Sequence, residues 1–600
     1  MKQFRVSYVL GAFAALTLLP ALSSAEEGRK FQMHERVPVI VNKVGPFNNP
    51  SETYQYYSLP YCKEGSGGVS RRERHGLGEL LVGDRKVVSP YEVNFLDSFT
   101  WRLLCKVELS EEDKKTFAEA IEDEYYFEMF VDGLPMYGYV GEPEGQAPIL
   151  GHTFEGSHTF LYPHLHFSIG YNKDQIVSVN VTTLNQRKVE ILDPNLKEVE
   201  FSYSVDWIEE PQLAWADRML RYADSRFIPS TFEIHWLSII NSFVLVLLLT
   251  IFLTIILMRV LKNDVSRYME IDNDEILEEE SGWKLIHGDV FRFPSHINLL
   301  AALIGSGVQL CATTALLLIC ALSGVFRATK RGSILTALLL IYVLTSFITG
   351  YISARLYRQM GGKNWTWNII TAALVFPGPL ALVWSFLNSV AWSNASTAAL
   401  PAATVFIILG LFIFVSFPLS VVGGIAGRNS AGDFDAPCRT KKVAREIPKD
   451  GPCFQHPVVQ ALLAGFLPFS AIYIELHYIF NSIWGHKIYT LFGILVLAFI
   501  MLFMVTSLIT IALIYFQLTR EDHRWWWRTF LNGGATGLFI LAYSFFYYFQ
   551  RSEMDGFFQA SYFFGYMAIV SYAFFIMLGS VGFLSSLSFV RHIYSVIKTD

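Results

Sequence analysis

The chain has 600 residues, of which 52% are hydrophobic, 15% aromatic and only 17% charged. A soluble protein of this length would form three or four domains, but so apolar a composition excludes that organisation and predicts a polytopic membrane protein. The formal net charge of −6 is small for the length and argues against a nucleic-acid partner.

The N-terminus, residues 1–25, has the three parts of a secretory signal peptide. Lys2 and Arg5 form a charged start, and residues 9–19 form an apolar run that is too short for an ordinary membrane span. The small residues that follow predict cleavage after Ala25. The mature chain is therefore expected to begin in the secretory lumen.

Residues 26–231 predict a soluble, β-rich lumenal domain. Short runs such as residues 176–181 alternate or carry β-branched side chains, and turn residues separate them. One segment, residues 110–126, predicts a helix, since Ser110 and Asp113 have the spacing of an N-terminal capping box. We interpret the domain as a β-sandwich with a helical insertion.

Cysteines and one sequon also point to the secretory lumen. Cys62 and Cys105 lie in the lumenal part and can form one disulfide there if the fold brings them together. Asn180 begins an Asn-Val-Thr sequon and is a predicted glycosylation site.

Two histidines in the same domain, His164 and His166, share one face of a predicted strand. A metal pair is conceivable at this spacing. Ordinary surface or edge-strand histidines are the simpler explanation, and we predict no metal site and no cofactor.

Residues 232–590 predict nine membrane spans, each apolar enough to cross a hydrocarbon core of roughly 30 Å. The expected spans are 234–260, 297–326, 334–354, 367–392, 398–427, 457–484, 488–517, 529–549 and 557–590. The predicted fold is an α-helical polytopic membrane protein with nine transmembrane helices, preceded by a β-rich, β-sandwich-like lumenal domain.

The charges of the loops test the orientation independently. With a lumenal N-terminal domain, nine spans place the C-terminus in the cytosol. The loops at 355–363, 428–449 and 520–528 are then cytosolic, and all three are basic, as the positive-inside rule requires. The basic loop at 327–331 disagrees, since this topology makes it lumenal.

Residues 591–600 form a short predicted cytosolic tail that ends Lys598-Thr599-Asp600. A basic residue two positions before a C-terminal acid suits recognition by a sorting coat at the membrane surface. Any short tail also ends in something polar, so the pattern alone does not decide between the two interpretations.

Glu475 is the intramembrane residue that most requires an explanation. It lies nine positions before the end of its span at 484, about 14 Å deep at 1.5 Å per residue. A carboxylate there must be protonated, paired or in a wet cavity. Pro468 lies seven residues earlier on nearly the same face, whereas His477 lies about 200° around the helix. We therefore expect the partner of Glu475, a Tyr, Ser or Thr, on a neighbouring span.

Two other spans carry prolines, at Pro377-Gly378-Pro379 and at Pro418. Kinked helices around a buried carboxylate are typical of transporters, and they also suit a lateral groove for other membrane helices. The chain has no Walker A, G-x-S-x-G or H-E-x-x-H motif, and we predict that it is not an enzyme.

Several longer motifs are similar to those of the nonaspanins, the transmembrane 9 superfamily. They are Tyr-Tyr-Ser-Leu-Pro-Tyr-Cys at 56–62, Gly-Trp-Lys-Leu-Ile-His-Gly-Asp-Val-Phe-Arg at 282–292, Leu-Pro-Phe at 467–469, Ile-Glu-Leu at 474–476 and Glu-Asp-His-Arg-Trp-Trp-Trp-Arg at 521–528. The resemblance covers nearly the whole mature chain, and the ending at Lys598 and Asp600 resembles the family's Lys-x-Asp tail.

This resemblance implies a protein of Golgi and endosomal membranes that acts in the sorting and surface expression of other transmembrane proteins, notably those with glycine-rich or polar spans. It also implies that coatomer binds the tail through Lys598 and Asp600. It carries over no catalytic residue. The alternative from the residues themselves is an ion or small-molecule transporter built around Glu475 and the kinked helices.

Overall fold

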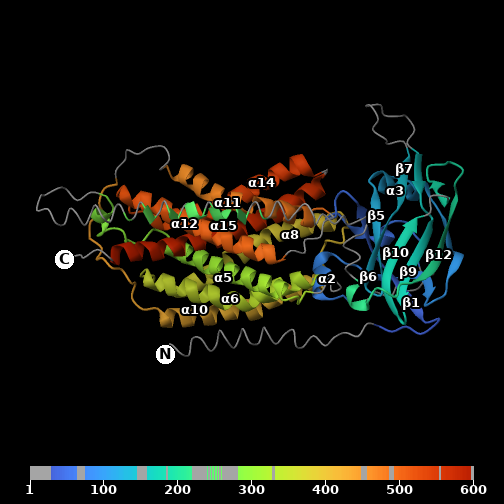
Figure 1. Ribbon diagram of the computed structural model, residues 1–600, viewed down its shortest axis with the longest axis horizontal. Coiled ribbons are helices and arrows are strands. Elements are labelled where there is room, and N and C mark those ends of the chain that lie inside the picture. The colour runs from blue at the N-terminus through green and yellow to red at the C-terminus, as the bar shows by residue number, and fades with distance from the viewer. Residues whose placement is uncertain are drawn as a thin grey trace, which may run out of the picture. The chain divides into compact units, whose positions relative to one another are not determined.

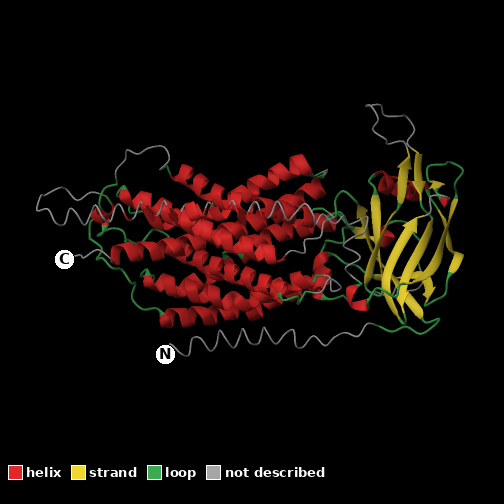
Figure 2. Ribbon diagram, in the orientation of Figure 1, coloured by secondary structure: helices red, strands yellow, loops and turns green. Residues whose placement is uncertain are grey.

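The computed structural model describes residues 29–63, 75–144, 158–183, 187–218, 282–326, 332–447, 456–485 and 492–595 except 553 and 555, with scattered positions between 240 and 262. The chain divides into two compact units, Met1–Pro229 with Cys320–Ser333, and Ser230–Ile319 with Ile334–Asp600. The first unit is built mainly of strands and the second of helices (Figure 2). The predicted signal peptide, including Ala25, and the basic loop at 327–331 lie outside the described residues.

The first unit contains two main β-sheets and a small third one. The first sheet has the order β2-β1-β5-β6, with β3 also paired to β1. Its strands are β1 (Arg36–Pro46), β2 (Tyr54–Gln55), β3 (Val87–Asn94), β5 (Tyr125–Val131) and β6 (Leu134–Tyr139). The second has the order β10-β9-β12-β4. Its strands are β4 (Phe99–Glu108), β9 (His164–Asn172), β10 (Gln175–Thr183) and β12 (Glu198–Glu209). The small sheet has β7 (Gly141–Glu144), β8 (His158–Leu161) and β11 (Val189–Glu190).

The two main sheets share one hydrophobic core. Val39 and Met129 of the first sheet and Phe167 and Tyr203 of the second are all fully or almost fully buried in it. Alternate residues of β12, namely Val199, Phe201, Tyr203 and Val205, belong to this core, which is the period-two pattern expected of a strand with one buried face. The predicted β-rich N-terminal domain is confirmed. Its β9–β12 pair is parallel, unlike the antiparallel pairs on either side of it.

The helix predicted at 110–126 is α3, which covers Glu111–Glu122. The Ser110 hydroxyl accepts from the Asp113 amide at 3.2 Å, and the Asp113 carboxylate accepts from the Ser110 amide at 3.0 Å. The predicted end at 126 is wrong, because Glu124 has a φ of 51° and Tyr125 already begins β5. A shorter helix, α2 (Leu77–Val82), ends at Gly83 in the left-handed conformation.

The second unit is a helical bundle in which long helices run alongside one another (Figure 1). Its helices are α5 (Ile297–Leu322), α6 (Ser333–Gln359), α7 (Trp365–Leu374), α8 (Pro377–Ser393), α9 (Ala402–Leu411), the π-helical turn η7 (Phe412–Ser416), α10 (Phe417–Ser430), α11 (Pro457–Ile483), α12 (Phe492–Thr519), α13 (Trp525–Gly534), α14 (Thr536–Arg551) and α15 (Phe557–Ser595). Counting α7–α8, α9–α10 and α13–α14 as one segment each, eight segments in the described part of the chain are long and apolar enough to cross a membrane. The chain is thus a polytopic membrane protein. The remaining predicted span, 234–260, falls mostly outside the described residues.

The long helices are interrupted near the prolines at 377 and 418, as predicted, and at one further place. Pro377 begins α8 after a two-residue turn at 375–376 that ends α7, and Pro418 follows the π-helical turn. A third break, at Ala535 between α13 and α14, follows a pair of glycines instead. Pro468 lies within α11, which continues through it.

Glycines allow the helices to approach closely. At Gly307 of α5, a Cβ atom would overlap the Ser580 side chain and the Ile576 carbonyl of α15. At Gly537 of α14 it would come within 2.5 Å of the Ser571 carbonyl of α15. Such contacts are typical of membrane bundles, in which van der Waals packing replaces much of the hydrophobic effect.

Candidate intramembrane and membrane-surface sites

Glu475 lies on α11 and is buried, with 6% of its surface exposed. Its Oε2 atom has no hydrogen-bond partner within the described residues. The predicted Tyr, Ser or Thr partner on a neighbouring span is therefore not found for this atom. A buried carboxyl oxygen without a donor is costly in a protein interior, so Glu475 remains a candidate site for a proton or a cation.

The surroundings of Glu475 come partly from α12. Pro468 lies on the same buried side of α11. Ala471, one turn before Glu475, packs in an apolar cluster with Met501 and Val505 of α12. An apolar wall of this kind supplies no hydrogen bond that would compensate for the burial of the carboxyl group.

His477 belongs to a separate polar chain between α11 and α14, as its position around the helix predicted. Its Nδ1 lies 2.9 Å from the Tyr543 hydroxyl, and its Nε2 lies 3.1 Å from Asn481 Nδ2. The Tyr547 hydroxyl donates to Asn481 Oδ1 at 3.0 Å. Sequence reasoning missed Asn481, Tyr543 and Tyr547. The available signal was that both pairs, 477 with 481 and 543 with 547, have the i, i+4 spacing of one helix face.

A second polar network joins α5, α6 and α7, and sequence reasoning missed it too. Asn368 on α7 donates to Asn298 Oδ1 of α5 at 2.8 Å and accepts from Ser353 of α6 at 3.0 Å. Further along, the Thr349 hydroxyl donates to Gln309. Every named member except Asn298 is almost fully buried, so this network binds the three helices together and is not an open site.

At one end of the bundle, α6, α10, α12 and α15 finish and α7, α11 and α13 begin. We call this the tail end, because the last residues of the chain follow α15. Here the indole Nε1 of Trp525 donates to the Val290 carbonyl at 2.7 Å. Arg445, in the loop after α10, forms an ion pair with Glu521 at 2.8 Å. The motif segments 282–292 and 521–528 therefore meet in space.

The end of α15 is held by the same assembly. The Tyr594 hydroxyl donates to the Trp283 carbonyl at 2.7 Å, and the two rings pack edge to face. The helix ends at Ser595. The predicted sorting residues Lys598 and Asp600 follow it and lie outside the described residues.

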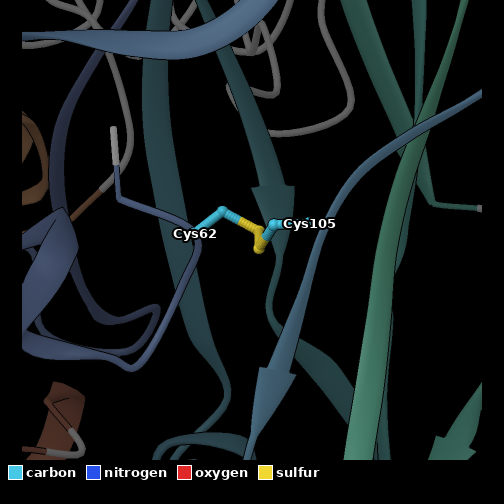
Figure 3. Close-up of a disulfide and its surroundings, with 2 residues drawn as sticks. All are labelled: Cys62 and Cys105. Carbon is cyan, nitrogen blue, oxygen red and sulfur yellow. A yellow bond between two sulfur atoms is a disulfide. The ribbon is translucent and has the colours of Figure 1, made fainter. Parts of the chain in front are cut away.

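In the N-terminal unit, Cys62 and Cys105 form a disulfide with their Cα atoms 6.1 Å apart (Figure 3). It joins the segment after β2 to strand β4, across 43 residues of sequence. Asn180 lies on β10 and is exposed, whereas its neighbour Val181 points into the core. An exposed sequon asparagine is the geometry that glycosylation requires.

The two predicted histidines lie side by side on β9 and bind hydroxyl groups of β12. His164 contacts the Ser202 hydroxyl through Nδ1 at 2.8 Å and the Ser204 hydroxyl through Nε2 at 3.0 Å. The Nδ1 of His166 also contacts Ser204, at 2.9 Å. Burial, and then the positive charge of Arg187, lower the pKa of His164 to about 4. No cluster of three or more metal-ligating side chains occurs in the part of the chain that the structure describes.

Comparison with known proteins agrees on one family. The family described as Endomembrane protein 70 matches residues 53–557. Transmembrane 9 superfamily member 4 of Arabidopsis thaliana is 48% identical, over 97% of this chain and 96% of its own. Transmembrane 9 superfamily member 1 of Bos taurus is 46% identical, over 98% and 97%. A protein of Dictyostelium discoideum named putative phagocytic receptor 1b is 45% identical, over 95% of both chains. No solved structure matches.

Proposed function

This chain belongs to the transmembrane 9 superfamily of multi-pass membrane proteins, and we propose on that ground that it sorts other transmembrane proteins in Golgi and endosomal membranes. In this role it binds cargo spans that are glycine-rich or polar and promotes their arrival at the cell surface, as a cargo receptor or an intramembrane chaperone. Such spans are solvated poorly by lipid and gain most from packing against another helix.

The observation that carries this proposal is the large lateral surface of the fourth and fifth predicted spans. Only 22% of the apolar stretch of Trp365–Ser393 and 11% of that of Ala402–Ser430 is buried in the bundle, against 61% for Trp525–Arg551. Large side chains such as Leu382, Phe406 and Phe414 point outward. These spans have surface available for lipid or for a further helix.

Recycling of the loaded receptor is assigned to the tail. The basic loops favour a cytosolic C-terminus and a lumenal N-terminal domain. Since α15 ends at Ser595, Lys598 follows only three residues later in the sequence, within the short tail that we propose a coat recognises. Coatomer is the proposed partner of Lys598 and Asp600.

The test is quantitative surface proteomics after acute depletion of the protein. Selective loss of proteins with glycine-rich or polar spans, restored by re-expression, is the expected result. In the same cells, Lys598→Ser should move the protein out of the Golgi and lower its binding to coatomer, whereas Thr599→Ser should change neither. A surface proteome that does not change would contradict the sorting role, and unchanged Golgi residence of Lys598→Ser would contradict the retrieval role.

A second candidate function rests on Glu475. Its buried Oε2, without a partner in the described structure, and the proline in the same helix favour an ion or small-molecule transporter. The test is flux in proteoliposomes for Glu475→Gln, with protein yield and monodispersity measured in parallel. Loss of flux by a folded variant supports transport. If the variant no longer folds, Glu475 has a structural role in the helical bundle instead.

A further inference from the structure

Three polar side chains lie on the outward face of α11 at intervals of about one helical turn. Tyr473, His477 and Asn481 follow one another at four-residue spacing, which places them in one stripe along the helix. Tyr473 has 41% of its surface exposed, and His477 and Asn481 are partly exposed. Tyr543 and Tyr547, which are almost fully buried, contact this stripe from the neighbouring helix α14 (Figure 1). We call these five residues the polar seam.

Most of this stripe lies at the depth of the hydrocarbon core. α11 has 27 residues and is about 40 Å long, so a core of roughly 30 Å covers all but its ends. With the middle of the helix at the middle of the bilayer, Tyr473 lies about 4.5 Å and His477 about 10.5 Å from the midplane. Polar side chains at such depths normally face the interior of a bundle. Because Tyr473 and His477 are not fully covered, part of their surface is left to lipid or to a further helix.

The hydrogen bonds of the polar seam leave donors without acceptors. Asn481 accepts from the Tyr547 hydroxyl through Oδ1 at 3.0 Å and donates to His477 Nε2 through Nδ2 at 3.1 Å. The single hydrogen of a neutral imidazole is then on Nδ1, which donates to the Tyr543 oxygen at 2.9 Å. The Tyr543 hydroxyl hydrogen and the second amide hydrogen of Asn481 therefore have no acceptor within the described residues. Reversing every bond of this chain would only move the surplus hydroxyl hydrogen from Tyr543 to Tyr547.

Tyr473 adds a further donor nearer the middle of the bilayer. Its ring packs edge to face on Tyr543, with ring centres 5.3 Å apart, and its centre lies 6.0 Å from that of Phe469. In the part of the chain that the structure describes, its hydroxyl group forms no hydrogen bond. An O–H or N–H in hydrocarbon without an acceptor is costly. The polar seam is therefore a row of hydrogen-bond donors on a lateral face of the bundle.

The depth and the surplus donors of the polar seam determine what can occupy it. An acceptor at the level of Tyr473 and His477 must belong to a group inside the membrane, because lipid headgroups lie outside the hydrocarbon core. A second copy of this chain would bring the same surplus of donors to a symmetric contact. The surplus donors are uncharged hydroxyl and amide groups, which can pair with an uncharged oxygen without burying a net charge.

We propose that the polar seam binds a transmembrane helix of another protein through a neutral hydrogen-bond acceptor, the side chain of an Asn, Gln, Ser or Thr at the depth of His477. Interhelical hydrogen bonds of this kind strengthen the association of membrane helices. The inference rests on the proposed sorting role, since it names the surface that would recognise the polar part of a cargo span.

The test measures binding in lipid vesicles as energy transfer from the labelled full-length protein to labelled single-span peptides. One peptide has a leucine-rich span with a Gln about seven residues from its centre, which matches the depth of His477, and the other has Leu at that position. The wild type should bind the Gln peptide about fivefold more tightly than the Leu peptide. Tyr473→Phe with Asn481→Leu should remove this preference, because it removes an exposed hydroxyl group and the amide.

The matched control is Ser470→Ala. Ser470 is exposed on the same helix, three residues before Tyr473, but its hydroxyl donates to the Leu467 carbonyl at 2.7 Å. Since it offers no surplus donor, its removal should leave the preference for the Gln peptide unchanged. If the double variant does not fold, Tyr473→Phe alone changes only one exposed hydroxyl group and should lower the preference by about half.

Equal binding of the two peptides by the wild type would overturn the proposal, as would a preference that persists in the seam variants. Energy transfer between copies of the protein that depends on the same residues would identify a second copy as the occupant, and would also overturn it. The surface proteome tests the sorting role separately. A peptide preference with an unchanged proteome contradicts sorting but not the polar seam, whereas a changed proteome without a peptide preference contradicts the polar seam alone.

Discussion

The indole N–H of Trp525 donates to the carbonyl oxygen of Val290, 235 residues earlier in the sequence, at 2.7 Å. Both residues are fully buried. Trp525 also stacks on Trp526, with ring centres 4.5 Å apart, and on Phe583 of α15. One side chain therefore joins the segment before α5, the start of α13 and the last helix.

Trp525→Phe tests this connection. The phenyl ring keeps most of the apolar contact but removes the donor, which leaves the buried Val290 carbonyl unpaired. We expect a loss of about 1–3 kcal/mol in stability and faster hydrogen exchange across residues 288–292. Trp392→Phe is the control, because Trp392 is 71% exposed. An equal effect of both substitutions would show that the hydrogen bond does not hold the tail end together.

The membrane spans could be predicted well from the sequence because each one is a continuous run of apolar residues, which a short window of sequence is enough to reveal. It also placed Glu475 in a buried position and His477 on another side of α11. It did not predict the bonds of His477 with Tyr543 or of Asn481 with Tyr547. Those bonds depend on which helix packs beside α11 and on how that helix is rotated about its own axis. Neither property can be predicted from a local pattern in the sequence.

Prediction of the N-terminal domain from its sequence was limited in the same way. Alternation of apolar residues predicted strands, and the capping box placed the start of α3 at Ser110. The parallel pairing of β9 with β12, which brings His164 beside Ser202 and Ser204, was not predictable, since it joins strands on opposite sides of a long connection. The end of α3 was predicted too late because the turn at Glu124 has no glycine or proline to mark it.

Gly307→Ala should destabilise the bundle. A methyl group there would overlap Ser580 and the Ile576 carbonyl, so α5 and α15 must separate. We expect a cost of about 1–3 kcal/mol, measured as a lower melting temperature of the detergent-solubilised protein. The matched control is Gly410→Ala in α9, where a Cβ atom meets nothing within 4 Å. It should be neutral or gain up to about 1 kcal/mol through better helix propensity. A melting temperature unchanged by Gly307→Ala would show that these helices do not pack closely.

The disulfide should stabilise the N-terminal domain by restricting its unfolded state. Cys62→Ser with Cys105→Ser should lower the free energy of unfolding by about 2–4 kcal/mol for a loop of this length. The measurement is hydrogen exchange of β4 and β12 in the full-length protein. Peptide mapping without reductant should recover residues 62 and 105 in one linked fragment of the wild type. Free thiols at both positions would contradict the bond.

The N-terminal domain should lose stability as the pH falls through the range of secretory and endosomal compartments, and His164 should be a main cause. Its pKa in the folded protein, about 4, is below the value of about 6.5 in an unfolded chain, so the unfolded state binds a proton first. The stabilising effect of keeping His164 neutral is complete above pH 6.5 and decreases as the pH falls towards 4. Between pH 7 and pH 5 we expect a loss of about 2 kcal/mol.

Hydrogen exchange of β9 and β12 at the two pH values, corrected for the intrinsic rates, measures this loss. His164→Gln should abolish most of it, because an amide can bind both serine hydroxyls and does not titrate. If His164→Gln retained the full pH dependence, the loss would have to come from other groups, and the buried histidine would be only a packing residue of the sheet.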